Sequence, residues 1–156
     1  MLCENIIGSI KEDKFKYYKI DYVDIEWHDA FKKIHKKMTR NNMEIGIKLE
    51  DFILKRGLND GDVLGVYDDT AIVVNILEAL SLVINVEDTH MIPKVCYEIG
   101  NRHATLLYGR SHNEFITIYD EPIKVMIENL GVKVEVKKVK LDFNKKISAS
   151  INNHHH

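Results

Sequence analysis

Histidine is the residue type in this chain best suited to chemistry, because imidazole nitrogens bind nickel, copper and zinc ions. The chain has 156 residues, and eight of them are histidines. They occupy positions His28, His35, His90, His103, His112, His154, His155 and His156. The first five form neither an HExxH nor an HxH pattern, and the two cysteines, Cys3 and Cys96, are far apart. This spacing argues against a zinc site whose ligands all come from one chain.

His103 closes the most informative motif of the chain. A box of Gly100, Asn101, Arg102 and His103 follows an amphipathic stretch that ends near Ile99. Glycine tolerates a left-handed backbone and a cation interacts favourably with the helix dipole, so we expect the box to end a helix with Gly100 in the turn. A helix end accounts for the composition of the box, but it does not account for any use of His103.

The remaining histidines support weaker hypotheses. His112 lies in a polar turn at residues 110–113, where it either assists a metal site or is only a turn residue. His28, His35 and His90 are predicted to lie at the surface. The terminal histidines His154, His155 and His156 are either a native metal-binding tail or part of a purification tag.

Motifs of the common catalytic classes are missing from the sequence. It contains no GxSxG and no P-loop, and the GDVLGV stretch at residues 61–66 is not followed by a helical pattern. Acylphosphatase-like chemistry needs an Arg and an Asn that converge on a phosphate, whereas Asn101 and Arg102 are adjacent and point apart. The sequence therefore predicts a protein that is not an enzyme.

Four lysines follow one another closely before residue 40. They are Lys32, Lys33, Lys36 and Lys37. Such a run is either a solvated face or a patch that docks an acidic protein partner. Both interpretations stay open at the level of the sequence.

Composition limits the classes of partner. The chain is 45% hydrophobic and 29% charged, as expected of a soluble globular protein. Its 22 basic and 24 acidic residues give a net charge of -2, so any basic binding site has to be local. We see no apolar run typical of a signal peptide or a membrane span, and no disulfide framework. These observations predict a cytoplasmic protein that binds neither nucleic acid nor membranes.

The first half of the chain reads as a small β domain. Short apolar runs predict strands over residues 6–10, 17–23, 45–49, 63–67 and 71–76. Asn41-Asn42 and Asp68-Asp69 are good turn residues between them. One segment resists this interpretation, because Trp27, Phe31, Ile34 and Met38 recur at helical spacing.

The second half alternates strands and helices. Alternating apolar residues predict strands over residues 80–86, 105–109, 114–118 and 132–139, the last with an irregularity near Lys137-Lys138. Helical periodicity predicts helices over residues 92–99 and 121–130, the second capped by Asp120 and ended by Gly131. The order is βαββαβ, the split βαβ or ferredoxin-like pattern. We therefore predict two domains, an all-β, sandwich-like domain over residues 1–78 and an α+β ferredoxin-like domain over 79–150. A tail over residues 151–156 follows them.

With this order and the box in place, the chain resembles the UreE family of urease accessory nickel metallochaperones. The resemblance rests on four segments, residues 24–27, 44–49, 58–64 and 96–103, of which the last is the most specific. It implies that the β domain serves protein contacts and that the ferredoxin-like domain forms a homodimer. It also implies a β-hairpin over residues 33–49 around Asn41-Asn42, against the helical stripe, and we follow it because propensity is the weaker argument.

The resemblance also assigns the box a use. It implies that His103 meets its symmetry mate in the dimer and that the two imidazoles bind Ni²⁺, for which Zn²⁺ or Cu²⁺ could substitute. His154, His155 and His156 would add ligands from the tail, and a metal-bridged tetramer is a further option. The implied partners are a GTPase of urease assembly and the urease apoprotein, with delivery of nickel to urease as the function. The alternatives are a docking adaptor with incidental metal binding and a protein that stores or senses zinc.

Overall fold

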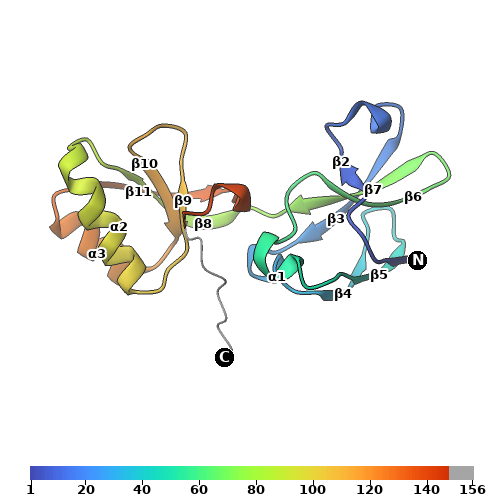
Figure 1. The fold of residues 1–156 in the computed structure, drawn as a ribbon, viewed down its shortest axis with the longest axis horizontal. Helices are drawn as coiled ribbons and strands as arrows, with labels where there is room; N and C mark the ends of the chain where they lie inside the picture. Colours follow the sequence, from blue (N-terminus) through green and yellow to red (C-terminus); the bar gives the residue numbers. More distant parts are fainter. Residues whose placement is uncertain (148–156) are drawn as a thin grey trace. The chain divides into compact units, whose positions relative to one another are not determined.

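The computed structural model describes residues 1–147 (Figure 1). The chain divides into two compact units, the first ending at Leu77 and the second beginning at Glu78. The boundary placed from the sequence, after residue 78, falls one residue later. Each unit has its own sheets and its own core, and they are described separately.

Two small sheets make up the N-terminal unit. The first has the order β1-β5-β4 and the second the order β2-β6-β7-β3. Their strands are β1 (Leu2–Cys3), β2 (Gly8–Ser9), β3 (Lys19–Ile25), β4 (Ile34–Met38), β5 (Glu44–Lys48), β6 (Asp62–Tyr67) and β7 (Thr70–Ile76). Short helical turns connect them: η1 (Asp13–Phe15), η2 (Trp27–Asp29) and α1 (Ile53–Arg56). The unit is thus strand-rich, as predicted, although β1 and the turn α1 were not predicted.

The segment with the helical stripe is a β-hairpin. β4 pairs antiparallel with β5, and Asn42 makes the turn with a φ of 62°. The side-chain oxygen of Thr39 accepts a hydrogen bond from the N–H of Met43 at 3.0 Å, which closes the loop. The helix interpretation is therefore wrong and the hairpin implied by the family resemblance is confirmed.

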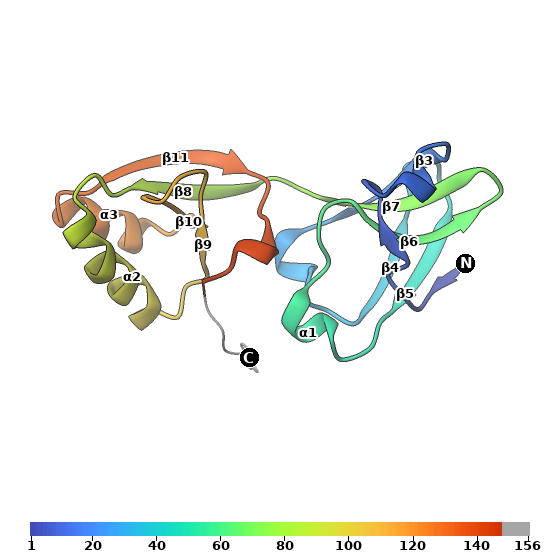
Figure 2. The same cartoon turned by 45° about the horizontal axis from the view of Figure 1, so that its top comes forward.

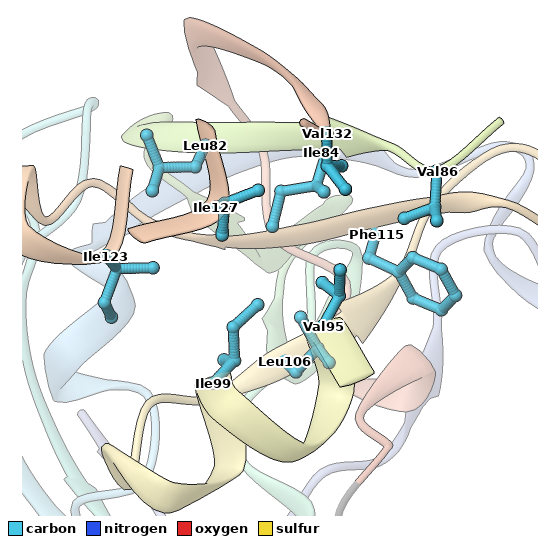
Figure 3. Packing of buried hydrophobic residues seen from close by; sticks show 10 residues of the cluster. All are labelled: Leu82, Ile84, Val86, Val95, Ile99, Leu106, Phe115, Ile123, Ile127 and Val132. Carbon is cyan, nitrogen blue, oxygen red and sulfur yellow. The ribbon is translucent and has the colours of Figure 1, made fainter. Parts of the chain in front are cut away.

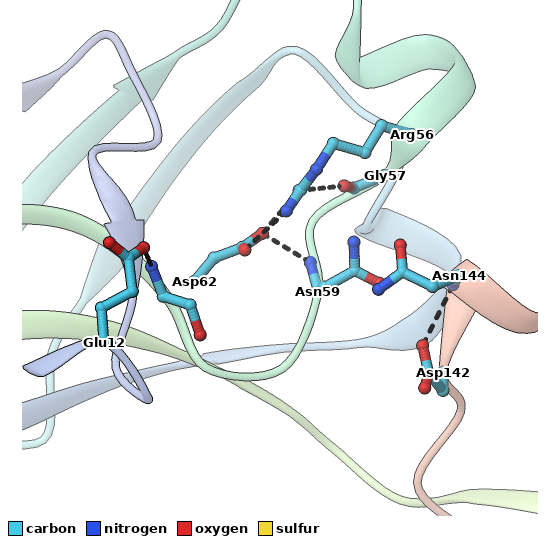
Figure 4. Close-up of polar contacts among 8 residues, drawn as sticks. Glu12, Arg56, Gly57, Asn59, Asp62, Asp142 and Asn144 are labelled. Carbon is cyan, nitrogen blue, oxygen red and sulfur yellow. Dashed lines mark hydrogen bonds and ion pairs between the residues drawn. The ribbon is translucent and has the colours of Figure 1, made fainter.

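One buried ion pair fixes the loop that enters β6. The carboxylate of Asp62 accepts hydrogen bonds from both terminal nitrogens of Arg56 at 2.7 Å and from the N–H of Asn59 at 2.8 Å (Figure 4). The Asp62 side chain is only 5% exposed. The bidentate contact with this carboxylate raises the pKa of Arg56.

Replacing Arg56 with methionine is expected to lower the free energy of unfolding of this unit by about 3 kcal/mol, because a buried carboxylate would lose its partner. Urea unfolding followed by fluorescence of Trp27, the single tryptophan, measures this unit directly. Lys19→Met is the control, since the Lys19–Asp69 pair is exposed and such pairs contribute little to stability. Equal losses in both variants would contradict the assignment.

The C-terminal unit has the predicted order of strands and helices. Its elements are β8 (Ala79–Asn85), α2 (Ile92–Asn101), β9 (Leu106–Tyr108), β10 (Glu114–Ile118), α3 (Glu121–Asn129) and β11 (Lys133–Val139), with the turns η3 (Thr89–Met91) and η4 (Phe143–Lys145). The sheet order is β11-β8-β10-β9 and every neighbouring pair is antiparallel. The side chain of Asp120 caps α3 as predicted, accepting from the N–H of Ile123 at 2.9 Å. β11 pairs with β8 without a break, so the predicted irregularity near Lys137 is wrong.

The core of this unit lies between the sheet and its two helices. Figures 1 and 2 show α2 and α3 together on one side of the sheet. Figure 3 shows their inward side chains packed against those of the strands. The core residues are Leu82, Ile84, Val86, Val95, Ile99, Leu106, Phe115, Ile123, Ile127 and Val132. This packing holds α2 in a fixed orientation, so the residues at its end are positioned by a rigid element.

Candidate metal centre

Helix α2 positions the box that contains His103. Val95 and Ile99 are fully buried on its inner face, whereas Tyr97 on the outer face is 68% exposed. The helix ends at Asn101, and the last turn closes with hydrogen bonds to the carbonyls of Ile99 and Gly100. The box therefore starts inside the helix and ends just beyond it.

His103, and not Gly100, adopts the left-handed conformation. Its φ is 58°, and its N–H donates to the carbonyl oxygen of Gly100 at 3.0 Å. Gly100 has ordinary helical backbone, so the expectation that it makes the turn is wrong. A left-handed backbone costs a residue with a side chain about 1–2 kcal/mol, although histidine is among the types found there more often. A position where glycine would be more stable thus holds an exposed imidazole.

A shallow apolar groove lies beside the box. Its lining is shared by α2 and α3 and comprises Glu98, Arg102, Glu121, Pro122, Val125, Met126, Asn129 and Leu130. Val125 is 45% exposed within it. The surface around the box is therefore partly hydrophobic although the helix end itself is polar.

A complete ligand set is not present in the described part of one chain. Among residues 1–147, no three side chains of His, Cys, Asp or Glu come together at a spacing that could hold a metal ion. A metal ion bound by His103 would therefore need further ligands from a second chain, from water or from residues beyond this range.

The other candidate ligands lie apart from the box along the chain. His112 is exposed in the turn between β9 and β10, His90 is exposed in η3, and the side chain of His28 is 57% exposed in η2. His154, His155 and His156 lie outside the described residues. Cys96 is half-buried against the helix core, and burial raises the pKa of its thiol, as expected for a packing residue and not a ligand.

His35 differs from its predicted exposure. It is 7% exposed, because alternation along β4 turns it inward, and its Nε2 lies 2.9 Å from the carbonyl oxygen of Lys32. Burial lowers the pKa of His35 below its usual value. It is a structural residue of the N-terminal unit.

The buried His35 predicts a pH dependence of stability. The unfolded state has a histidine pKa of about 6.5. Because the folded state has a lower pKa, the unfolded state binds more protons in this range, and stability falls as pH drops below about 7. Unfolding followed by Trp27 fluorescence between pH 7.5 and 5.5 should show a smaller loss in His35→Gln than in wild type. An unchanged slope in His35→Gln would contradict the assignment.

The four lysines proposed for docking do not share one face. The side chain of Lys36 is 79% exposed, whereas that of Lys37, next along β4, is 29% exposed. Their carboxylate partners are Asp29 for Lys32 and Lys37, Asp51 for Lys33 and Glu44 for Lys36. The run is therefore a set of paired charges, of which only Lys36 and Lys37 lie on β4, on opposite sides of the strand.

Comparison with known families identifies both units. Residues 3–77 match the model of the UreE urease accessory protein N-terminal domain, and residues 78–156 match that of its C-terminal domain. The chain belongs to the UreE urease accessory protein family. Similar UreE proteins come from Helicobacter acinonychis (strain Sheeba) and Helicobacter pylori (strain G27), each 38% identical over 151 residues, 97% of this chain and 88% of the relative. UreE of Helicobacter bizzozeronii is 36% identical over 150 residues, 96% of this chain and 84% of the relative.

Membership of the UreE family makes this chain an accessory protein of urease and not the urease enzyme. Within residues 1–147, no helix has the length and apolar character needed to cross a bilayer. The sequence does not reveal the left-handed backbone of His103, because Gly100 is the residue type that favours such a turn. It does reveal the outer face of α2: Pro93, Tyr97 and Gly100 are spaced by four and three residues, which places them on one side of the helix.

Proposed function

We propose that this UreE protein is a metallochaperone that carries Ni²⁺ to urease during urease maturation, as a homodimer in the cytoplasm. The observation that carries the proposal is the exposed His103, held in a left-handed conformation at the end of a rigid helix. Strain of this kind persists where a side chain has a use. We assign the C-terminal unit to the ferredoxin-like class, supported by its order β11-β8-β10-β9.

The outer face of α2 supports a twofold contact. A Cβ built on Gly100 meets no heavy atom of the described chain within 4 Å, so this face has room for the close approach of another helix. Tyr97, one turn earlier, exposes an aromatic ring, and aromatic residues are common at interfaces. A twofold axis beside this face would bring His103 of two chains to one ion.

Such a site suits a cargo ion. Two neutral imidazoles fill only two coordination positions of Ni²⁺ and leave the others to water, so the ion is bound but remains exchangeable. His154, His155, His156 and His112 are candidates for extra ligands that raise capture. Zn²⁺ and Cu²⁺ bind imidazole as well, so the donor set alone does not select nickel.

The partners follow from the accessory role of the family. A protein that delivers nickel has to contact urease apoprotein or a GTPase of its assembly complex. We assign this role to the N-terminal unit, including the region of Lys32, Lys33, Lys36 and Lys37. A metal-bridged tetramer is the proposed higher assembly.

The test is urease activation in a bacterium that lacks its own UreE and is supplied with this chain. Wild type should restore urease activity at limiting nickel, and His103→Ala should not, whereas excess nickel should restore activity in both. His90→Ala is the matched control, an exposed histidine outside the box. If His103→Ala restores activity at limiting nickel as well as wild type, the adaptor function replaces the carrier function.

A further inference from the structure

The sheet of the C-terminal unit has a second face, opposite its helices, and this face contains a pocket. Leu106 and Phe115 point into the helix core, so alternation places their neighbours Leu107 and Ile116 on the other side. Leu107 and Ile116 both line the pocket. The pocket is therefore separate from the box and from α2.

The end of the described chain closes the pocket. After β11, at one edge of the sheet, the chain passes through η4 and reaches β9 at the other edge, where the N–H of Ile147 donates to the carbonyl of Leu106 at 2.9 Å. Leu141 and Phe143 are buried along this path, 4% exposed each. The crossing segment brings Lys140 and Lys145 to the same pocket as β11.

The lining is strongly basic. Its residues are Glu78, Leu107, Tyr108, Gly109, Arg110, Ile116, Lys137, Lys138, Val139, Lys140, Leu141, Asp142 and Lys145. Five of them are cations and two are acids, which leaves three positive charges in excess, in a chain whose net charge is -2. The lining is thus a local basic site in a chain of negative net charge.

Most of these cations lack an acidic partner. Within residues 1–147, the side chains of Arg110, Lys137, Lys138 and Lys145 form no ion pair within 4.0 Å. The lysines of β4 and α3 differ, because Lys36 and Lys124, for example, each bind a glutamate. Like charges gathered around one concave surface raise the local positive potential, and an anion would relieve their repulsion.

Two of the lining residues direct their side chains to the helix face of the sheet. Tyr108 pairs with Phe115 across the strands, and the two rings lie 6.2 Å apart on that face. Lys138 pairs with Leu80, which alternation places on the same face as Leu82 and Ile84. The side chains that could hold a ligand in this pocket are therefore the other cations. The pocket volume of about 380 Å³ lies in the range of small-molecule sites.

We propose that this pocket binds the polyphosphate group of a nucleotide or of inorganic pyrophosphate. Arg110, Lys137 and Lys145 supply the charge. The site is independent of the proposed nickel function and of the dimer face. A concave pocket of this size fits a small anion better than the flat surface of an acidic protein.

The test is calorimetric titration of the metal-free chain with pyrophosphate and with ADP at 50 and 200 mM salt. We expect saturable binding that weakens with salt, and a loss of at least tenfold in affinity for both anions in Lys137→Ala/Lys145→Ala. Lys133→Ala is the matched control, an exposed lysine of the same strand outside this pocket, and should bind as wild type. Tighter binding of ADP than of pyrophosphate supports a nucleotide as the ligand, whereas equal or weaker binding of ADP supports the inorganic anion.

Three results would overturn the proposal. The first is that neither pyrophosphate nor ADP binds at millimolar concentration. The second is that Lys133→Ala loses as much affinity as the double variant. The third is that the protein binds polyglutamate but neither pyrophosphate nor ADP. Thermal unfolding of each variant shows that it is folded. Because no measurement involves nickel or urease, failure here leaves the carrier function untouched.

Discussion

Replacing His103 with glycine is expected to abolish tight nickel binding while keeping or increasing stability. The left-handed backbone at this position costs histidine about 1–2 kcal/mol and costs glycine little, so His103→Gly should unfold at equal or higher temperature than wild type. His103→Ala loses the ligand and keeps the strain, so it should be less stable than His103→Gly by about 1 kcal/mol. Together the two variants separate loss of the imidazole from loss of the fold.

Calorimetric titration with Ni²⁺ measures the effect in a background where His154, His155 and His156 are alanine. We expect one ion per two chains for the background protein and a loss of at least about 100-fold in affinity, or about 2.8 kcal/mol, in both His103 variants. His90→Ala should bind as the background does. One ion per single chain, or full affinity without His103, would rule out the symmetric site.

Periodicity was enough to predict the C-terminal unit because both helices and the sheet pack on one core. Val95 and Ile99 repeat at helical spacing, and Leu82 and Ile84 alternate, since each pair faces the same buried layer. The first strand of the N-terminal hairpin, β4, has no such pattern. On β4 the apolar Ile34 is 71% exposed and the polar His35 is 7% exposed, the reverse of what hydrophobicity predicts. Only the family resemblance placed this strand.

The His103 box and the basic pocket were both missed in part from the sequence, the first because of a local backbone detail and the second because of a long-range contact. Which box residue turns left-handed is set by where the last helical hydrogen bond forms, and the types Gly100 and His103 alone pointed to the wrong one. The basic pocket forms only because residues 140–147 return to β9, and such a long-range contact leaves no local pattern.

Gly100→Leu is expected to weaken dimerisation without harming the single chain. A Cβ at Gly100 meets no described atom within 4 Å and the backbone there is helical, so leucine fits the monomer and improves helix propensity by about 1 kcal/mol. At a close twofold contact the same side chain would hold the helices apart. We expect the dimer dissociation constant to rise by about 100-fold in analytical ultracentrifugation, with nickel affinity falling in parallel because both need two chains.

Lys94→Leu provides the matched control on the same helix. Lys94 is exposed and lies about 120° around the helix from Gly100, so its leucine should leave the close approach at Gly100 intact. If Gly100→Leu raises helix stability and leaves both the dimer and nickel binding unchanged, the outer face of α2 is solvent-exposed in the assembly. His103 would then have to find its second ligand elsewhere. If the dimer and nickel affinity fall together in Gly100→Leu alone, the glycine of the box serves close approach and the histidine serves the ion.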